Sequence, residues 1–185
     1  MKRLLQIVLC LTLVLLCTAG CGKKKEAGSF EGTYSQLMDA MRTDLDTAGD
    51  QDVFASEPTS REAAANGKQP AAKILTYKML ADTDAEMDVY TLSKNDEVYQ
   101  VTLRADMNAL SHAQQEKLAT VVDLLTQAFE RKEREKLWEE LHLPLTGDAI
   151  AAETTGTMAS WSCTVEDGKL TLTATALAYL EYVEA

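Results

Sequence analysis

The sequence is poor in the residues on which most catalytic and metal sites depend. It has two histidines, His112 and His142, thirty positions apart on one predicted helix, which separates them by about 45 Å if the helix is straight. They cannot share a site within one chain. The sequence also lacks a glycine-rich phosphate loop, a Gly-x-Ser-x-Gly motif, a His-Glu-x-x-His motif and a Cys-x-x-Cys pair. We therefore predict no catalytic residue, no metal site and no cofactor.

Basic residues and long apolar runs are scarce as well. The chain has 29 acidic and 18 basic side chains and a formal net charge of −11 at pH 7. An acidic protein repels the phosphate backbone, so no nucleic-acid partner is expected. The longest apolar run, Leu4–Leu16, has 13 residues, whereas a helix that crosses a bilayer needs about 20. The run is therefore too short for a permanent transmembrane anchor.

What the sequence does have is an export signal at its N-terminus. Two basic residues precede the apolar run, and the small residues Thr18, Ala19 and Gly20 follow it, directly before Cys21. This charged, apolar, small-residue order is that of a secretory signal peptide. Residues 1–22 also resemble the signal of bacterial prolipoproteins, whose lipobox is a large aliphatic residue, two small residues and the cysteine that receives lipid. Ala19, Gly20 and Cys21 match it, while Thr18 stands where leucine is usual.

The resemblance implies that residues 1–20 are a lipoprotein signal peptide, cut between Gly20 and Cys21. It further implies a diacylglycerol on the Cys21 sulfur, with a further acyl group such as palmitate on its amine, and thereby a membrane partner. Gly22 stands where aspartate would retain such a protein in the inner membrane. The expected location is the outer membrane, facing the periplasm, in a cell with two membranes, and otherwise the outer leaflet of the cytoplasmic membrane. The alternative is an ordinary secretory peptide cut after Ala19.

The mature chain would have 165 residues, enough for one ordinary domain. Cleavage of residues 1–20 removes Lys2 and Arg3 but no acidic residue, so the formal net charge changes from −11 to −13. Residues 21–29 are the lipidated cysteine and a short tether of eight residues, which reaches at most about 25–30 Å. The domain is therefore expected to stay close to the bilayer. Cys163 has no partner for an intrachain disulfide, and its apolar neighbours predict a buried structural thiol.

The rest of the chain divides into a helix, a polar stretch and a larger domain. Residues 30–48 have apolar side chains at helical spacing, typical of an amphipathic helix that either packs on the domain or binds a partner. Residues 49–72 contain two glycines, two prolines and only scattered apolar residues, so we predict a linker or long loop with a short helix around 61–65. Residues 73–185 are predicted to form an α+β domain.

Alternating apolar and polar side chains predict strands in that domain. After a first strand at 74–80, residues 88–94 and 97–105 are expected to pair around a two-residue Asn95-Asp96 turn. Residues 160–166 and 169–176 are expected to pair around Asp167-Gly168, a strong two-residue turn signal. The apolar face of the first hairpin is predicted to contain Tyr90, Leu92, Tyr99, Val101 and Leu103.

A long amphipathic helix is predicted for residues 111–141, begun by a capping box of Ser111 and Gln114. Unbroken, it would be about 46 Å long, whereas a domain of this size is about 35 Å across. It must overhang or break, and residues 130–136, which have no apolar side chain, are the candidate. The predicted class is α+β, in the order α-β-β-β-α-β-β. We expect an antiparallel sheet built from hairpins, with one face covered by the long helix.

One polar surface stands out in the last hairpin. Alternation places Ser and Thr side chains on the face opposite Trp161 and Cys163. This face is a possible docking surface, or an edge for strand addition. Threonine also favours solvated strands without any binding role. We call this surface the Ser/Thr face, and it consists of Ser162, Thr164, Thr171, Thr173 and Thr175.

These features favour a lipid-anchored, non-enzymatic accessory or binding module of the bacterial cell envelope, with an envelope protein as its possible partner. A first alternative is a carrier or sensor of a small or apolar ligand in a pocket between the long helix and the sheet, where methionines would form an adaptable lining. A second alternative is an enzyme, whose first sign would be a pocket with converging carboxylates of raised pKa.

Overall fold

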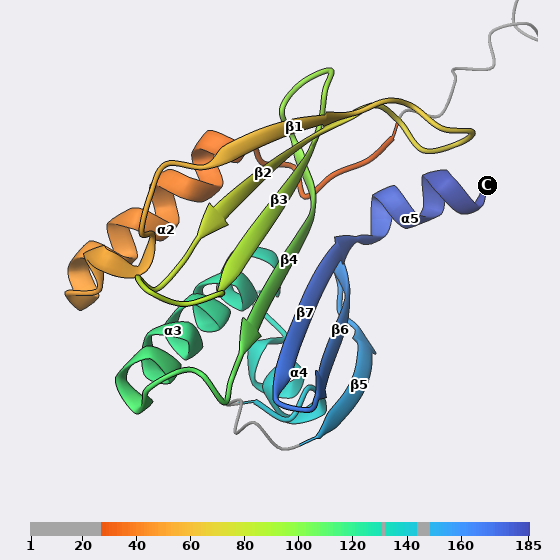
Figure 1. The fold of residues 1–185 in the computed structure, drawn as a ribbon. Coiled ribbons are helices and arrows are strands. Elements are labelled where there is room, and N and C mark those ends of the chain that lie inside the picture. Colours follow the sequence, from red (N-terminus) through yellow and green to blue (C-terminus); the bar gives the residue numbers. More distant parts are fainter. Residues whose placement is uncertain (1–26, 131, 144–148) are drawn as a thin grey trace, which may run out of the picture.

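A computed structural model describes residues 27–130, 132–143 and 149–185. The described residues form one seven-stranded antiparallel sheet with helices packed against it, which confirms the predicted α+β class (Figure 1). The strand order is β1-β2-β3-β4-β7-β6-β5, so only the β4–β7 neighbours are distant in sequence. The strands are β1 (Thr59–Ala63), β2 (Ala72–Lys78), β3 (Glu86–Leu92), β4 (Val98–Asp106), β5 (Ile150–Thr155), β6 (Ala159–Glu166) and β7 (Lys169–Ala176).

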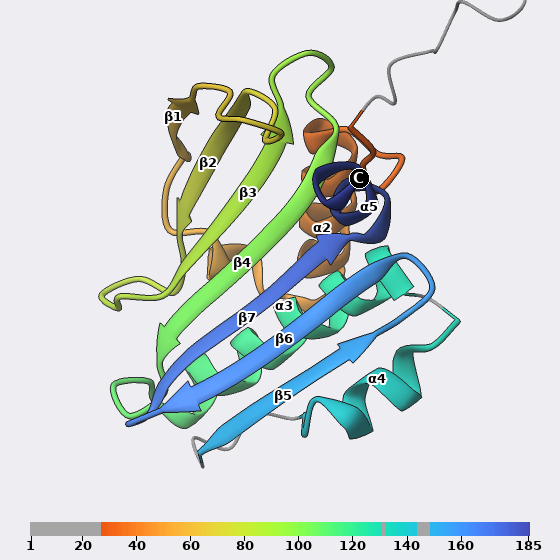
Figure 2. The same cartoon turned by 90° about the vertical axis from the view of Figure 1, so that its right-hand side faces the viewer.

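Helices α2 (Tyr34–Ala48) and α3 (His112–Glu130) lie on one face of this sheet, the inner face. Figure 2 shows both behind the strands, while α4 (Arg134–Glu140) lies beside β5 and α5 (Leu177–Glu184) at one end. A 3₁₀ turn, η1 (Gln51–Val53), follows α2. None of the described helices combines the length and the apolar character that a membrane crossing requires.

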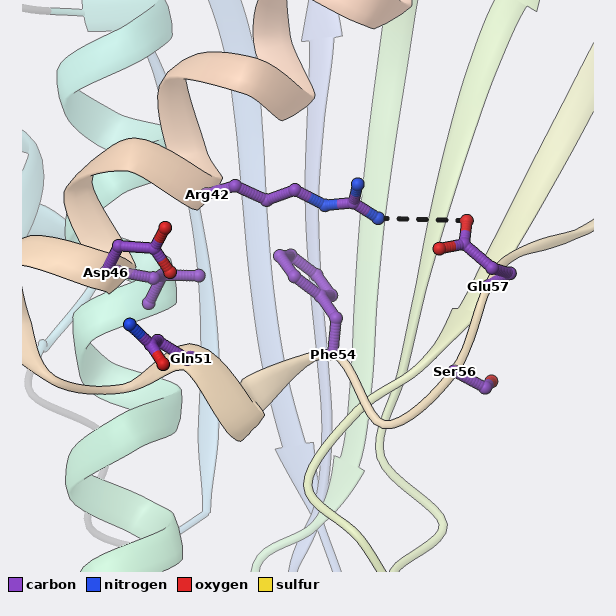
Figure 3. Close-up of a pocket in the computed structure, with 7 residues that line it drawn as sticks. Arg42, Asp46, Gln51, Phe54, Ser56 and Glu57 are labelled. Atoms are coloured by element: carbon purple, nitrogen blue, oxygen red, sulfur yellow. Dashed lines mark ion pairs between the residues drawn. The ribbon is translucent and has the colours of Figure 1, made fainter.

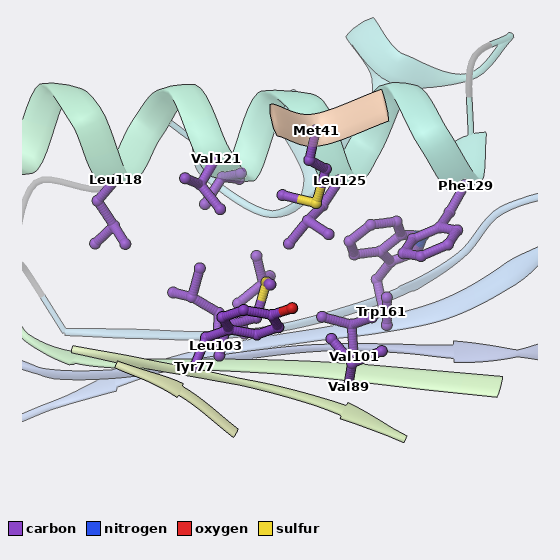
Figure 4. Packing of buried hydrophobic residues seen from close by; sticks show 14 of the residues in the cluster. Met41, Tyr77, Val89, Val101, Leu103, Leu118, Val121, Leu125, Phe129 and Trp161 are labelled. Carbon is purple, nitrogen blue, oxygen red and sulfur yellow. The ribbon is translucent and has the colours of Figure 1, made fainter. Parts of the chain in front are cut away.

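The core lies between the inner face and the helices. The register places a row of six side chains across the sheet, all on the inner face, and α3 packs onto them with the apolar stripe that its sequence predicts (Figure 4). Complete burial of a side chain the size of leucine or methionine stabilises the fold by about 1.5–3 kcal/mol. The row is Tyr77, Met87, Leu103, Leu172, Cys163 and Ala152, and the stripe is Leu118, Val121, Val122, Leu125 and Phe129.

Local capping sets where the helices begin. Thr33 and Gln36 form a capping box, so α2 begins at Tyr34 rather than at Phe30. Phe30 instead lies before the helix, and its N–H donates to the Val98 carbonyl over 2.9 Å. The predicted box before α3 is present: Ser111 N–H donates to Gln114 Oε1 over 2.9 Å.

The Asp167-Gly168 hairpin has the predicted register, with Glu166 opposite Lys169 and Cys163 opposite Leu172. Both turn residues have positive φ, 51° and 79°, as a two-residue hairpin turn of this twist requires. The other hairpin was predicted wrongly. Leu92 N–H bonds to the Glu97 carbonyl, so the turn has four residues rather than two, and the register shifts again between Tyr90 and Thr91. The bulge turns Tyr90 to the opposite face from Val101.

Three further features differ from the sequence-based prediction. The stretch 49–72 is not all linker, because it contains η1 and β1, and β1 replaces the expected helix at 61–65. β1 is an edge strand with four exposed residues, so it lacks an apolar alternation. β5 and α5 were not predicted. The long helix breaks within residues 130–136, as its length and composition predicted: α3 ends at Glu130 and α4 begins at Arg134.

A buried carboxylate lies at the end of α3. Glu130 is 1% exposed and accepts four hydrogen bonds from the β5–β6 turn. Thr157 donates through its N–H (3.0 Å) and its hydroxyl (2.8 Å), and the N–H groups of Met158 (2.6 Å) and Ala159 (2.7 Å) donate to the other oxygen. A Cβ built on Gly156 would lie 2.4 Å from the Glu130 Cδ, so glycine is what permits this approach.

Candidate functional site

The face of the sheet turned away from α2 and α3, the outer face, is built mainly of polar side chains. In Figure 2, β4, β7, β6 and β5 stand in front of α3, and of the described helices only α5 lies on the viewer's side, at one end. Successive rows of the register carry hydroxyl, amide and charged groups across neighbouring strands. The central row is Thr76, Asp88, Thr102, Thr173, Ser162 and Glu153, flanked by Lys78, Glu86, Arg104, Thr171 and Thr164 on one side and by Tyr90, Gln100, Thr175 and Ser160 on the other.

The structure brings the whole predicted Ser/Thr face together at the centre of the outer face. Ser162 lies opposite Thr173, and Thr164 lies opposite Thr171. Thr164 is exposed and the other four members are half-buried. Their side chains are therefore open to a partner.

β4 extends this surface with residues that the sequence did not connect to it. The hydroxyls of Thr102 and Thr173 are 3.4 Å apart, and Gln100 Nε2 donates to Thr102 Oγ1 over 3.2 Å. Thr175 Oγ1 donates to Gln100 Oε1 over 3.5 Å. The alternation did place Gln100 and Thr102 on a polar face, but nothing local indicates that β4 pairs with β7.

A charged cluster occupies the β2–β4 side of the outer face. Asp88 is 2% exposed. It accepts a hydrogen bond from Thr76 Oγ1 (2.5 Å) and one from an Arg104 Nη (2.6 Å), and an Arg61 Nη lies 4.0 Å away. Arg104 also lies 3.7 Å from Glu86, which in turn pairs with Lys78. The Lys78–Glu86 hydrogen bond raises the pKa of the lysine.

Two shallow depressions have polar linings. One, of about 420 Å³, lies at an end of the outer face between Glu86, Arg104, Asp106 and Lys169. The other, of about 280 Å³, lies between α2 and η1, and Figure 3 shows Phe54 at its side, beneath the Arg42–Glu57 ion pair of 3.9 Å. Both have mixed charges.

The described residues give little support to catalysis. They contain no group of three or more His, Cys, Asp or Glu side chains that could hold a metal ion. His112 has an exposed side chain whose Nε2 lies 3.4 Å from Glu116 Oε1. Cys163 is fully buried, and desolvation raises the pKa of its thiol to about 11. A thiol with so high a pKa is a poor nucleophile at neutral pH.

The predicted lipidation and cleavage residues, Cys21 and Gly20, lie outside the described residues. The chain was also compared with known proteins. No family model, no curated protein and no solved structure matches it. The chemistry of the outer face and the N-terminal signal therefore carry the functional argument.

Proposed function

We propose that this protein is a lipoprotein of the bacterial cell envelope, anchored through lipid on Cys21, and that it serves as a non-enzymatic module that binds another envelope protein on its outer face. The observation that carries the binding role is the open outer face itself. Six strands contribute polar side chains to it, and the Ser/Thr face lies at its centre.

The composition of this face favours a protein partner. Tyrosine and arginine are enriched where protein interfaces derive most of their affinity. The outer face presents half-buried Tyr90 beside Gln100, and Arg61 and Arg104 near Asp88. Hydroxyl groups around them can donate and accept hydrogen bonds at the polar rim of an interface. Because threonine is also favoured in solvated strands that have no binding role, the experiment has to distinguish a docking surface from a surface that only faces water.

The carrier alternative gains less from the structure. It needs space between α3 and the sheet, and the described side chains on both sides of that interface are buried against one another: Leu118 and Leu103 are each 0% exposed (Figure 4). A ligand there would have to displace them.

Site-specific photo-crosslinking in intact cells tests the proposal. A photoreactive amino acid replaces Thr173 on the outer face, or Thr47 as a matched control. Thr47 is an exposed threonine on α2. Membranes are then solubilised in detergent and crosslinked species are identified by mass spectrometry. We expect one envelope protein crosslinked through position 173, absent from position 47, and reduced severalfold by Thr164→Lys. Equal crosslinking at both positions, or none at 173, would contradict the docking role.

The anchor is tested separately in the same cells. The intact mass of the membrane-bound protein should include a diacylglycerol, and Cys21→Ser should abolish that mass and release the chain from the membrane fraction. A soluble, unlipidated wild-type protein would overturn the anchoring, whatever the crosslinks show.

A further inference from the structure

The first described residues are fixed at one end of the sheet. Val98 N–H donates to the Gly32 carbonyl over 3.0 Å, and Ser29 Oγ donates to Glu97 over 2.6 Å. Gly28 packs directly on α5, since a Cβ built on it would lie 2.3 Å from the Ala178 Cβ. The chain therefore enters the domain between the β3–β4 turn and the first turn of α5. We call this end of the sheet the entry end.

The length of the preceding chain limits where the entry end can be. Only residues 22–26 separate Cys21 from Ala27, and five residues span at most about 20 Å even when fully extended. If Cys21 carries lipid, as proposed above, Ala27 lies within about that distance of the bilayer surface. No other part of the domain is held so closely by covalent structure.

The surface of the entry end has an independent apolar feature. Met158 is 41% exposed and is the one exposed large hydrophobic residue among those that the structure describes. It lies in the β5–β6 turn, and its carbonyl accepts a hydrogen bond from Leu177 N–H, the first residue of α5 (3.0 Å). On α5, Leu180 and Tyr182 are half-buried. Tyrosine and apolar side chains are favourable at the interface between lipid and water.

We propose that the entry end rests on the lipid headgroups, with Met158 and the outward side chains of α5 at the membrane surface and the strands directed away from it. The acidic Glu181 and Glu184 of α5 oppose deep insertion next to anionic lipids, so the contact is shallow. Lys23, Lys24 and Lys25 in the tether supply attraction to such lipids. This orientation leaves the outer face free for a partner. It rests on the proposed lipidation of Cys21.

Two reporter positions at opposite ends of β6 test the orientation. Met158 directly precedes this strand and Glu166 ends it; its eight residues span about 26 Å. Met158→Cys and Glu166→Cys are each labelled with a fluorophore in the lipidated protein. Cys21 is blocked by lipid and Cys163 is buried, so each variant has one reactive thiol. The proteins are reconstituted into phosphatidylcholine vesicles that contain lipids with a quencher on the headgroup.

We expect severalfold stronger quenching at position 158 than at position 166. Tyr182→Cys on α5 provides a second reporter for the entry end, so misfolding of one variant does not decide the result. Equal quenching at both ends of β6, or stronger quenching at position 166, would overturn the proposed orientation while leaving the lipid anchor intact. A protein without lipid mass that does not float with vesicles would instead overturn the anchor, and the orientation with it.

Discussion

Removal of the Glu130 carboxylate is the perturbation for which the structure gives the clearest expected magnitude. In Glu130→Ala, the N–H groups of Thr157, Met158 and Ala159 lose their acceptor. These bonds are the link between the end of α3 and the β5–β6 turn. The exposed residue Glu135, on α4, offers a matched glutamate without such contacts to the turn.

The expected loss of stability in Glu130→Ala depends on how far water can replace the carboxylate as a hydrogen-bond acceptor. A buried donor left without a partner costs about 1–3 kcal/mol. Ala159 is fully buried, whereas Thr157 and Met158 are exposed and water can satisfy part of their bonding. We therefore expect Glu130→Ala to lower the free energy of unfolding by about 2–4 kcal/mol, and Glu130→Gln by somewhat less because one acceptor oxygen remains. Glu135→Ala should change it by less than about 0.5 kcal/mol.

Urea unfolding of the mature chain carrying Cys21→Ser measures these differences through tryptophan fluorescence, since buried Trp161 reports on the core. Gly156→Ala extends the test as a double-mutant cycle. The three atoms nearest to an added Cβ at Gly156 all belong to Glu130, so the substitution should be costly in the wild type and much cheaper beside Glu130→Ala. Additive effects, or a Glu130→Ala variant as stable as the wild type, would refute the reasoning.

Two further predictions concern the last hairpin and the core. Gly168→Ala should lower the free energy of unfolding by about 1–2 kcal/mol in the same urea assay, because the Gly168 φ is +79° and the new Cβ would lie 2.1 Å from Asn108 Nδ2. The control is Gly67→Ala, where φ is also positive but the space around the residue is open, and it should lower the free energy of unfolding by less. The Cys163 thiol has its pKa raised from 9.0 to about 11 in the folded state by desolvation, so its stabilising contribution is complete below pH 9 and is lost as the pH rises toward 11. A thiol reagent should accordingly leave the native protein unmodified at pH 8. Rapid labelling of the native protein would contradict this prediction. So would a free energy of unfolding that stays constant above pH 9 in the wild type and falls in Cys163→Ala.

Local signals in the sequence determined what could be predicted of the fold. The Asp167-Gly168 turn, the Ser111 capping box and the apolar stripe of α3 each depend on neighbours within a few positions, and each is present as predicted. The prediction of a two-residue turn at Asn95-Asp96 was wrong, because the turn has four residues and Asp96 alone among them takes positive φ (55°). Asparagine followed by aspartate is a weaker signal for a two-residue turn than aspartate followed by glycine.

Elements stabilised by distant partners were missed for a different reason. β1 is mostly exposed and gains its structure from pairing with β2, and β5 is held by β6 and by Glu140 of α4, which accepts a hydrogen bond from Thr154. Neither strand has a pattern that distinguishes it from a loop. The same limit applies to the outer face: both of its halves were visible as polar alternations, but only the β4–β7 pairing joins them.

Apart from α5 at one end, the outer face can remain without a covering helix because its charged groups are satisfied within the sheet. Asp88 would be costly to bury alone, yet Thr76 and Arg104 on the two neighbouring strands donate hydrogen bonds to it, and Arg61 on β1 lies 4.0 Å away. The apolar row that stabilises the domain lies wholly on the other side. If the outer face docks a partner as proposed, stability and docking depend on different faces of the same strands, so substitution of exposed Thr164 should weaken binding without unfolding the protein. Substitution of Asp88 would impair both, which makes the Ser/Thr face the appropriate place to test the docking role.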